Sequence, residues 1–345
     1  MRIQYIDACR GFAILLVVIG HTVQYLYCPR NYDTNIIFRM IYAFHMPLFF
    51  FLSGYVSKVE IPSFEELAYI STKRAFQLLF PFCIWGIVIN RINYNEPVYH
   101  FLLKPDHSLW FIFHLFVINM YCNIILYFAS FLRDYGRLWL IRIVMLFVGY
   151  ILFAKIGEHN VNDYGQQSTM IYFYPYYVTG IILGKWRMKI VDNRKVRTLA
   201  LLSIIVFLTL AYVWYREPMA IDKDAPHLIM VLNQSLTYKY LTASIGIAAV
   251  VTFFSQIKTN YYLERLGRDS LGIYVIHMVM LALLSSYYYS ALHTFCDLFV
   301  GFCINAIILL IVTILLMKFI RSSRYTSMIL IGDVDKKMMN VLFKR

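Results

Sequence analysis

Long apolar runs alternate with short polar segments along the whole chain. A helix needs roughly 20 mostly apolar residues to cross the hydrocarbon core of a bilayer, and ten runs meet this requirement. They are residues 8–27, 36–56, 75–94, 108–132, 137–154, 169–186, 197–214, 238–257, 270–292 and 297–320. The pattern predicts an all-α fold, a polytopic membrane helical bundle with about ten transmembrane helices. We expect a single membrane domain over residues 1–345, with no appended soluble domain.

The Lys and Arg residues are unevenly distributed between the two sides of this bundle. Of the 32 in the chain, 22 lie beside the termini and in the loops on the same side, six lie in the opposite loops, and four fall within spans. Positively charged loops stay in the cytoplasm, so both termini are predicted to be cytoplasmic. The net charge of +13 therefore indicates membrane topology, and no nucleic acid partner is expected.

Composition excludes several other classes of protein. The chain is 60% hydrophobic and 15% charged, whereas soluble domains are about 45–50% apolar and about 25% charged. A soluble enzyme and a disordered protein are therefore both poor descriptions of it. The six cysteines are scattered, and no Cys or His cluster has the spacing of metal ligands. Neither a metal site nor a disulfide scaffold is expected.

Two ionisable residues share one face of the first span. Arg10 and His21 are eleven residues apart, and eleven steps of about 100° return to within about 20° of the starting direction. The rise between them is about 16 Å, so Arg10 is expected near the cytoplasmic surface and His21 near mid-membrane. Ionisable groups inside a span are costly and usually functional. Gly11 and Gly20 flank the pair and allow another backbone or a ligand to approach closely.

Polar motifs also occur in the later spans. In the second span Pro47 follows His45 and is expected to break the helix. The cytoplasmic turn before the third span carries Lys73 and Arg74, and His277 lies about two turns inside the ninth span. Three arginines near span ends are expected to extend their charged heads to the interface: Arg39, Arg91 and Arg142.

The spans contain no Asp or Glu near their middle. Many proton- and sodium-coupled transporters use such carboxylates as relays or ion ligands, so this absence counts against that class. An arginine at the cytoplasmic end and a neutral imidazole deeper in the membrane suit an anionic ligand that enters from the cytoplasm. The guanidinium would bind phosphate, and the imidazole would accept a proton.

Together these motifs resemble the acyltransferase-3 family of bacterial multi-pass membrane acyltransferases. The matches follow the family's order over residues 1–280. They are Arg10 and His21 within Tyr5–His21, the segment Phe44–Tyr55, Lys73 and Arg74 followed by Pro81, the segment Leu109–Phe111, and the segment Gly267–His277. One position departs from the pattern, since Gln77 stands where many members carry another basic residue.

The resemblance implies a membrane-bound O-acyltransferase of the bacterial cytoplasmic membrane. It implies transfer of an acyl group, usually acetyl, from cytoplasmic acyl-coenzyme A (acyl-CoA), a co-substrate that is not permanently bound. The acceptor would be a hydroxyl of a saccharide in a surface polysaccharide, lipopolysaccharide, peptidoglycan or a lipid-linked precursor. The identity of the acceptor, the acyl chain and the oligomeric state do not follow from the sequence.

The resemblance also implies roles for single residues. His21 would act as general base on the acceptor hydroxyl or carry the acyl group itself. A role in binding the phosphates of acyl-CoA is expected for Arg10, Lys73, Arg74 and Arg268. The candidates for the group that orients His21 are Ser53, Tyr274 and His45. Trp110 and His277 are further supporting candidates.

Two alternatives from other classes stay open. A transporter or flippase for an anionic lipid-linked sugar or another amphiphile would also use a basic cytoplasmic mouth and an aromatic interior. A transporter needs no acyl-CoA and forms no covalent bond, so the two functions are separable by experiment. A sensor or binding module is the second alternative, and the Arg10 and His21 pair argues against it.

Overall fold

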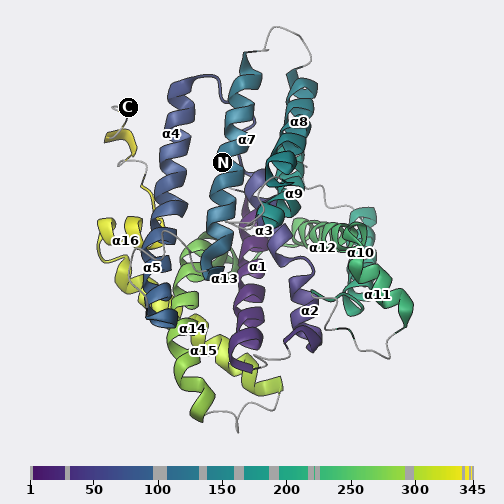
Figure 1. The fold of residues 1–345 in the computed structure, drawn as a ribbon, viewed down its shortest axis with the longest axis vertical. Helices are drawn as coiled ribbons and strands as arrows, with labels where there is room; N and C mark the ends of the chain where they lie inside the picture. The colour runs from purple at the N-terminus through teal and green to yellow at the C-terminus, as the bar shows by residue number, and fades with distance from the viewer. Residues whose placement is uncertain are drawn as a thin grey trace. The chain divides into compact units, whose positions relative to one another are not determined.

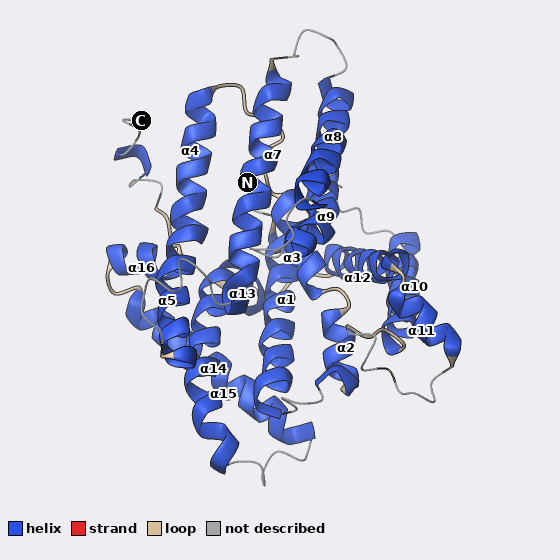
Figure 2. Cartoon of the chain, viewed as in Figure 1, coloured by secondary structure: helices blue, strands red, loops and turns tan. Residues whose placement is uncertain are grey.

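The computed structural model describes residues 3–27, 32–95, 107–131, 138–158, 167–185, 194–216, 221, 226–291, 299–335, 339–341 and 343. Across these ranges the regular structure is helical, with no strand among them (Figure 2). Seven helical stretches in these ranges are long and apolar enough to cross a membrane, and the bent pair Tyr261–Arg268 and Ser270–Leu284 provides an eighth if it counts as one span. The predicted all-α, polytopic membrane fold is confirmed.

Two further predicted spans coincide with helices that are not among these stretches, α8 (Leu138–Glu158) and α9 (Gln167–Lys185). The apolar part of α8 is Arg142–Leu152, which is shorter than a span. The number of ten spans therefore stays a prediction, although a helix lies at each predicted position. Residues 297 and 298, at the start of the last predicted span, lie outside the described residues.

The chain divides into two compact units, and each is described by itself. The first unit is Met1–Phe49, Arg91–Asn95 and Lys189–Ile320. The second unit is Phe50–Asn90, Glu96–Met188 and Arg321–Arg345. The expectation of a single membrane domain stays a prediction.

The first unit is built around its first helix. This helix, α1 (Gln4–Thr22), continues into a π-helical turn, η1 (Val23–Tyr27). The other helices of the unit are α2 (Ile36–Tyr42), α10 (Arg194–Tyr212), α11 (His227–Gln234), α12 (Leu236–Gln256), α13 (Tyr261–Arg268), α14 (Ser270–Ala291) and α15 (Phe299–Ile320). Because α2, α12, α13, α14 and α15 all pack against α1 (Figure 1), the small and branched side chains of α1 form the core of the unit.

The second unit is built around α7 (Trp110–Ser130). Its other helical elements are α4 (Phe64–Arg74), the π-helical turn η3 (Ala75–Leu79), α5 (Phe80–Tyr94, the last residues of which belong to the first unit), η4 (His107–Leu109), α8, α9 and α16 (Arg324–Ile331). The helix α7 packs against α4, α8 and α9, and α4 and α7 run side by side in Figure 1. A remaining helix, α3 (His45–Tyr55), crosses the boundary between the units.

The second predicted span is interrupted just before its proline. The helix α2 ends at Tyr42 and α3 begins at His45, so the break lies at residues 43–44. Proline has no N–H to donate to the carbonyl four residues earlier, and its ring clashes with that carbonyl. For Pro47 this carbonyl belongs to Ala43, so the break lies where the proline is expected to cause one.

The helix that contains Lys73 and Arg74 begins earlier than predicted. These residues were expected in a cytoplasmic turn before a span at 75–94, but they form the last turn of α4. The Oγ of Ser63 accepts the backbone N–H of Glu66 at 3.2 Å and caps the helix. Two glutamates in the first turn stabilise the helix, because their negative charges lie at the positive, N-terminal end of the helix dipole. Their charge also lowers the hydropathy, which is why an apolar pattern did not include them.

Two of the three arginines expected at the interface are buried. Arg39 is 9% exposed and Arg142 is 4% exposed. The guanidinium of Arg39 lies 4.1 Å from the centre of the Tyr215 ring, and Arg142 forms an ion pair with Glu60 at 2.8 Å. The charge of Arg142 is therefore paired with a carboxylate, whereas that of Arg39 lies against an aromatic ring. Arg91 is exposed, as predicted.

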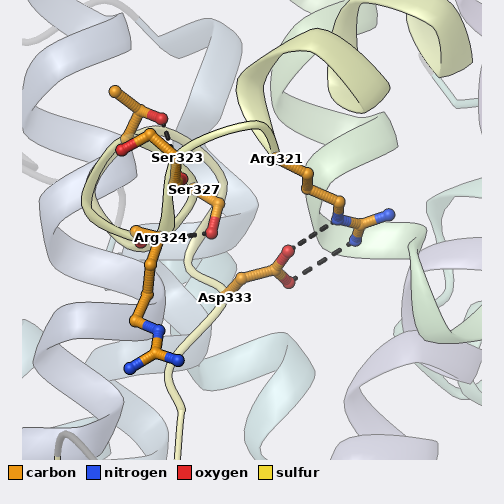
Figure 3. A network of polar contacts seen from close by, with 6 residues as sticks. Arg321, Ser323, Arg324, Ser327 and Asp333 are labelled. Atoms are coloured by element: carbon orange, nitrogen blue, oxygen red, sulfur yellow. Dashed lines mark hydrogen bonds and ion pairs between the residues drawn. The ribbon is translucent and has the colours of Figure 1, made fainter.

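Residues 321–335 belong to the second unit and contain a short helix. This helix is α16, which packs against η3. Arg321 donates through Nε to Asp333 at 2.7 Å and ties the two ends of this segment together (Figure 3). Gly332 ends the helix with φ +70°, and a Cβ there would lie 2.2 Å from the carbonyl oxygen of Gln77. Only glycine fits this close approach.

Candidate functional site

The backbones of α1 and α13 touch at two glycines in the first unit. A Cβ on Gly11 would lie 2.0 Å from the carbonyl oxygen of Leu263, and a Cβ on Gly267 would lie 1.8 Å from that of Asp7. Real Cβ atoms essentially never come within 3.0 Å of such atoms. Glycine at both positions therefore allows the two helices to pack backbone against backbone.

This contact places two arginines on touching helices. Arg10 precedes the first glycine and Arg268 follows the second. Arg10 Nη1 lies 3.9 Å from Asp7 Oδ1, and Arg268 Nη1 lies 3.9 Å from Glu264 Oε2. Both carboxylates are buried and orient the arginine of their own helix. Two guanidinium groups of this kind offer the planar set of N–H donors that suits phosphate.

A second contact pairs two histidines about 16 Å farther along α1. After α13 the chain bends by 70° and continues as α14, which packs against α1 and carries His277. The rings of His21 and His277 are nearly parallel, with centroids 5.2 Å apart and 9° between their planes. The Nδ1 atom of His21 lies 2.9 Å from the Nε2 atom of His277.

The direction of this hydrogen bond follows from a third atom. The Nδ1 atom of His277 lies 2.7 Å from the carbonyl oxygen of Ile273, and a carbonyl can only accept. In the neutral ring Nδ1 of His277 therefore carries the proton, and its Nε2 is the acceptor. His21 then donates from Nδ1, which leaves the lone pair on its own Nε2. The chain Ile273–His277–His21 thus sets the tautomer of His21.

His277, which the sequence had named only as a supporting residue, makes the hydrogen bond to His21. A role in orienting His21 stays a prediction for Ser53, Tyr274 and His45. Tyr274 packs its ring edge against His277, with centroids 5.7 Å apart. His45 is 1% exposed and donates from Nδ1 to the carbonyl of Ile41 at 2.8 Å.

Two aromatic rings also pack against His21. Tyr25 and Tyr42 present their edges to it, with ring centroids 5.8 Å and 6.3 Å away. The Tyr42 hydroxyl donates to Oε1 of Gln24 at 2.5 Å, which fixes the ring. These contacts hold the imidazole in one orientation.

Lys73 and Arg74 belong to the second unit. Both are half-buried at the end of α4, and Arg74 donates through Nη1 to Oε1 of Gln77 at 3.1 Å. The sequence reasoning had placed Gln77 outside the family pattern, and here it supports Arg74. A shared site of these two residues with Arg10 and Arg268 stays a prediction.

Ser53 contributes its backbone to a buried polar chain in the second unit. Its carbonyl accepts the hydroxyl proton of Ser57 at 2.8 Å, so the Tyr177 hydroxyl donates to Ser57 Oγ, also at 2.8 Å. Asn119 donates to the Tyr177 oxygen at 2.5 Å and accepts from Asn123 at 3.0 Å. These hydrogen bonds link α7 and α9 to the segment that follows α3, a pattern that stabilises a membrane interior.

Trp110 lies at the start of α7 in the same unit. Its ring centroid is 5.1 Å from that of His114 and 5.4 Å from that of Phe173. These are packing contacts within the unit, and its role as a supporting residue stays a prediction. Within the described ranges, no three His, Cys, Asp or Glu residues are grouped so that they could hold a metal ion.

Comparison with known proteins identifies several relatives. A family model described as an acyltransferase domain matches residues 3–319. The nodulation protein NolL of Mesorhizobium japonicum is 22% identical over 352 aligned positions, which cover 94% of this chain and 89% of that protein. The NolL protein of Sinorhizobium fredii is 40% identical over 86 positions, 24% of this chain and 23% of that protein. No solved structure matches.

Proposed function

Because the chain belongs to the acyltransferase-3 family, we propose that it is an integral membrane O-acyltransferase that uses cytoplasmic acyl-CoA, with acetyl as the acyl group. The acceptor is a hydroxyl of a saccharide in a surface polysaccharide, lipopolysaccharide, peptidoglycan or a lipid-linked precursor. The enzyme acts in the bacterial cytoplasmic membrane. Family membership supports acyl transfer; the donor, the acceptor and the membrane belong to the proposal.

The observation that carries the proposal is the free lone pair on Nε2 of His21. In the proposed mechanism this atom removes the proton of the acceptor hydroxyl while the hydroxyl oxygen attacks the thioester carbonyl carbon. The carbon–sulfur bond breaks, and the leaving thiolate takes the proton from Nε2 as free coenzyme A. A general base of this kind contributes about 10²- to 10⁴-fold. His277 keeps the reactive nitrogen unprotonated and the ring in place, in the manner of the third member of a catalytic triad.

Acyl-CoA, the donor, binds at the Arg10 end of the α1 face that carries Arg10 and His21. Arg10 and Arg268 bind phosphates of acyl-CoA, joined in the proposal by Lys73 and Arg74. The rise of about 16 Å between Arg10 and His21 is of the order of the pantetheine arm, so the thioester reaches the imidazole when the phosphates are bound. The long ion pairs to Asp7 and Glu264 support the proposal, because a phosphate can displace a carboxylate at 3.9 Å.

The test is transfer of label from radiolabelled acetyl-CoA in membranes that contain the wild type, His21→Ala or His227→Ala. His227 is an exposed residue at the start of α11 and serves as the matched control. Label should move to the lipid-linked or polysaccharide fraction with the wild type and the control and not with His21→Ala. Wild-type transfer by a correctly inserted His21→Ala protein would refute the role of His21.

A flippase or transporter is separated from this function by the same assay. It would show movement of an amphiphile that does not depend on acetyl-CoA and forms no labelled ester. The absence of transfer and of coenzyme A binding in all three membranes would favour it.

A further inference from the structure

A second basic cluster lies at the end of α1 away from Arg10. It consists of Arg39 on α2, Arg216 after α10 and Lys239 on α12, and we call it the distal basic cluster. All three belong to the first unit. Its position follows from Tyr42 on α2, whose hydroxyl bonds to Gln24 beyond the His21 end of α1.

The three cations converge through short contacts. The Arg39 guanidinium lies 4.1 Å from the centre of the Tyr215 ring, and the Arg216 guanidinium lies 5.7 Å from the centre of the Tyr42 ring. Lys239 Nζ donates to the backbone carbonyl of Arg216 at 3.1 Å. Since Arg39 and Tyr42 are three residues apart on a helix, they share a face. Two helices and the segment after α10 thus place three positively charged residues in linked contacts.

The segment that carries Tyr215 and Arg216 is fixed in advance. Asn233 on α11 is fully buried and accepts the backbone N–H of Tyr215 at 2.6 Å. It donates to the carbonyls of Val213 at 2.7 Å and Ile229 at 2.9 Å. Two of these hydrogen bonds hold the segment, and the third, to Ile229, lies within α11. The cluster therefore needs little rearrangement to bind a ligand.

Arg39 is the member that points to a ligand. It is nine-tenths buried, and its Nε has no hydrogen-bond partner in the part of the chain that the structure describes. Across the same residues it makes no ion pair, even with Asp33 in the turn before α2. A ring face compensates a buried charge only in part. An anion that accepts hydrogen bonds from this guanidinium would balance the remaining charge and provide a partner for Nε.

The cluster is also close to the proposed base. The rings of His21 and Tyr42 are 6.3 Å apart, and the Arg216 guanidinium lies on the same Tyr42 ring. An anion bound by Arg216 and a hydroxyl at His21 would therefore both lie beside the Tyr42 ring. A saccharide with a charged substituent can place its two groups on either side of one aromatic ring.

We propose that the distal basic cluster is the subsite for a negatively charged group, a phosphate or a carboxylate, carried by the acceptor. The inference rests on the proposed function and narrows its acceptor to an anionic saccharide or saccharide phosphate. The donor is not the source of this charge, because its phosphates are assigned to Arg10 and its thioester to His21. No charged part of acyl-CoA then remains for the opposite end of α1.

The first experiment determines the charge of the acceptor. Membranes with wild-type protein receive radiolabelled acetyl-CoA, and the labelled product is passed over an anion exchanger at neutral pH. We expect the exchanger to retain the labelled product. After mild alkali has released the acetyl group, the exchanger should still retain the acceptor itself. A labelled product that flows through as a neutral molecule would overturn the proposal.

The second experiment measures binding without catalysis. It therefore tests whether the distal basic cluster binds an anion even if no acetyl transfer occurs. Purified protein in phosphatidylcholine nanodiscs is given radiolabelled inorganic pyrophosphate with excess coenzyme A to fill the donor site. Arg39→Gln, and separately the double variant Arg216→Gln with Lys239→Gln, should weaken binding at least about tenfold, as loss of charge-assisted hydrogen bonds does. Arg197→Gln, which removes one exposed charge at the other end of α10, should bind like the wild type.

The outcomes separate the possible sources of the anion. Equal binding by all variants would overturn the proposal, and the double variant keeps the test valid if Arg39→Gln does not fold. Added phosphatidylglycerol that displaces pyrophosphate, together with a neutral labelled product, would assign the cluster to a lipid headgroup and overturn the acceptor assignment. Loss of binding in the variants with no acetyl transfer in any membrane would support the anion site while refuting the proposed function.

Discussion

At the scale of single residues, a backbone carbonyl determines which nitrogen of His21 carries the proton. Ile273 accepts from His277, His277 accepts from His21, and the lone pair remains on Nε2 of His21. In soluble triads a carboxylate has this orienting role. A neutral imidazole performs it here without placing a negative charge in the membrane, where ionised groups are costly.

This arrangement predicts different results for two substitutions of His277. His277→Leu keeps an apolar side chain but removes the acceptor, so kcat should fall about 10²-fold or more. His277→Gln places a side-chain carbonyl close to the former Nε2 and should recover part of the loss. The KM for acetyl-CoA should be unchanged in both, because the donor phosphates bind elsewhere. Steady-state kinetics of acetyl transfer measures both quantities.

A structural role alone would give another result. Equal kcat for the Leu and Gln variants, or a wild-type kcat for His277→Leu, would show that the hydrogen bond to His21 is not used. Matched thermal unfolding midpoints of the two variants are the control for folding.

At the scale of elements, the contact of α1 with α13 determines where Arg268 lies. The short helix α13 has a polar sequence and is too short to be recognised as part of a span. Its glycine meets the glycine of α1, and the 70° bend that follows sends α14 back along α1 toward His21. The two glycines therefore place Arg268 beside α1, and the bend places His277 beside His21.

Gly11→Ala should disturb this alignment directly. The new Cβ would meet a backbone carbonyl that cannot move without its helix, and such overpacking costs about 1–3 kcal/mol. We expect a lower midpoint of thermal unfolding in detergent and a higher KM for acetyl-CoA. Gly149→Ala is the control, since its nearest neighbour is the flexible end of Ile125. Equal effects of the two substitutions would contradict this account.

The elements also show what sequence could and could not predict. The apolar runs located the spans, and the helical period placed Arg10 and His21 on one face of α1. The start of α4 was missed because Glu65 and Glu66 break the apolar pattern. The pairing of His21 with His277 could not be predicted, since 256 positions separate them and their contact depends on a bend and a backbone approach that no periodicity records.

At the scale of the whole molecule, the chain is a multi-pass membrane protein and its orientation is a prediction from charge. Alkaline phosphatase fused after Arg216 should be active, because that segment is predicted to face outside. The same reporter fused after Lys258 should be inactive in the cytoplasm, since basic loops are retained there. A green fluorescent protein fused at the same two points should show the opposite pattern. Active phosphatase after Lys258 would reverse the assigned topology.

The two basic ends of α1, with His21 between them, have an energetic consequence. If the donor stays on one side and the acceptor on the other, the acyl group crosses the hydrophobic barrier as part of a chemical reaction, and neither carrier crosses with it. The driving force is then the free energy of the thioester. An ion gradient has no part in such a step, which agrees with spans that lack central carboxylates. Modification of the outer surface would continue in a cell whose membrane potential has collapsed, for as long as acyl-CoA is supplied.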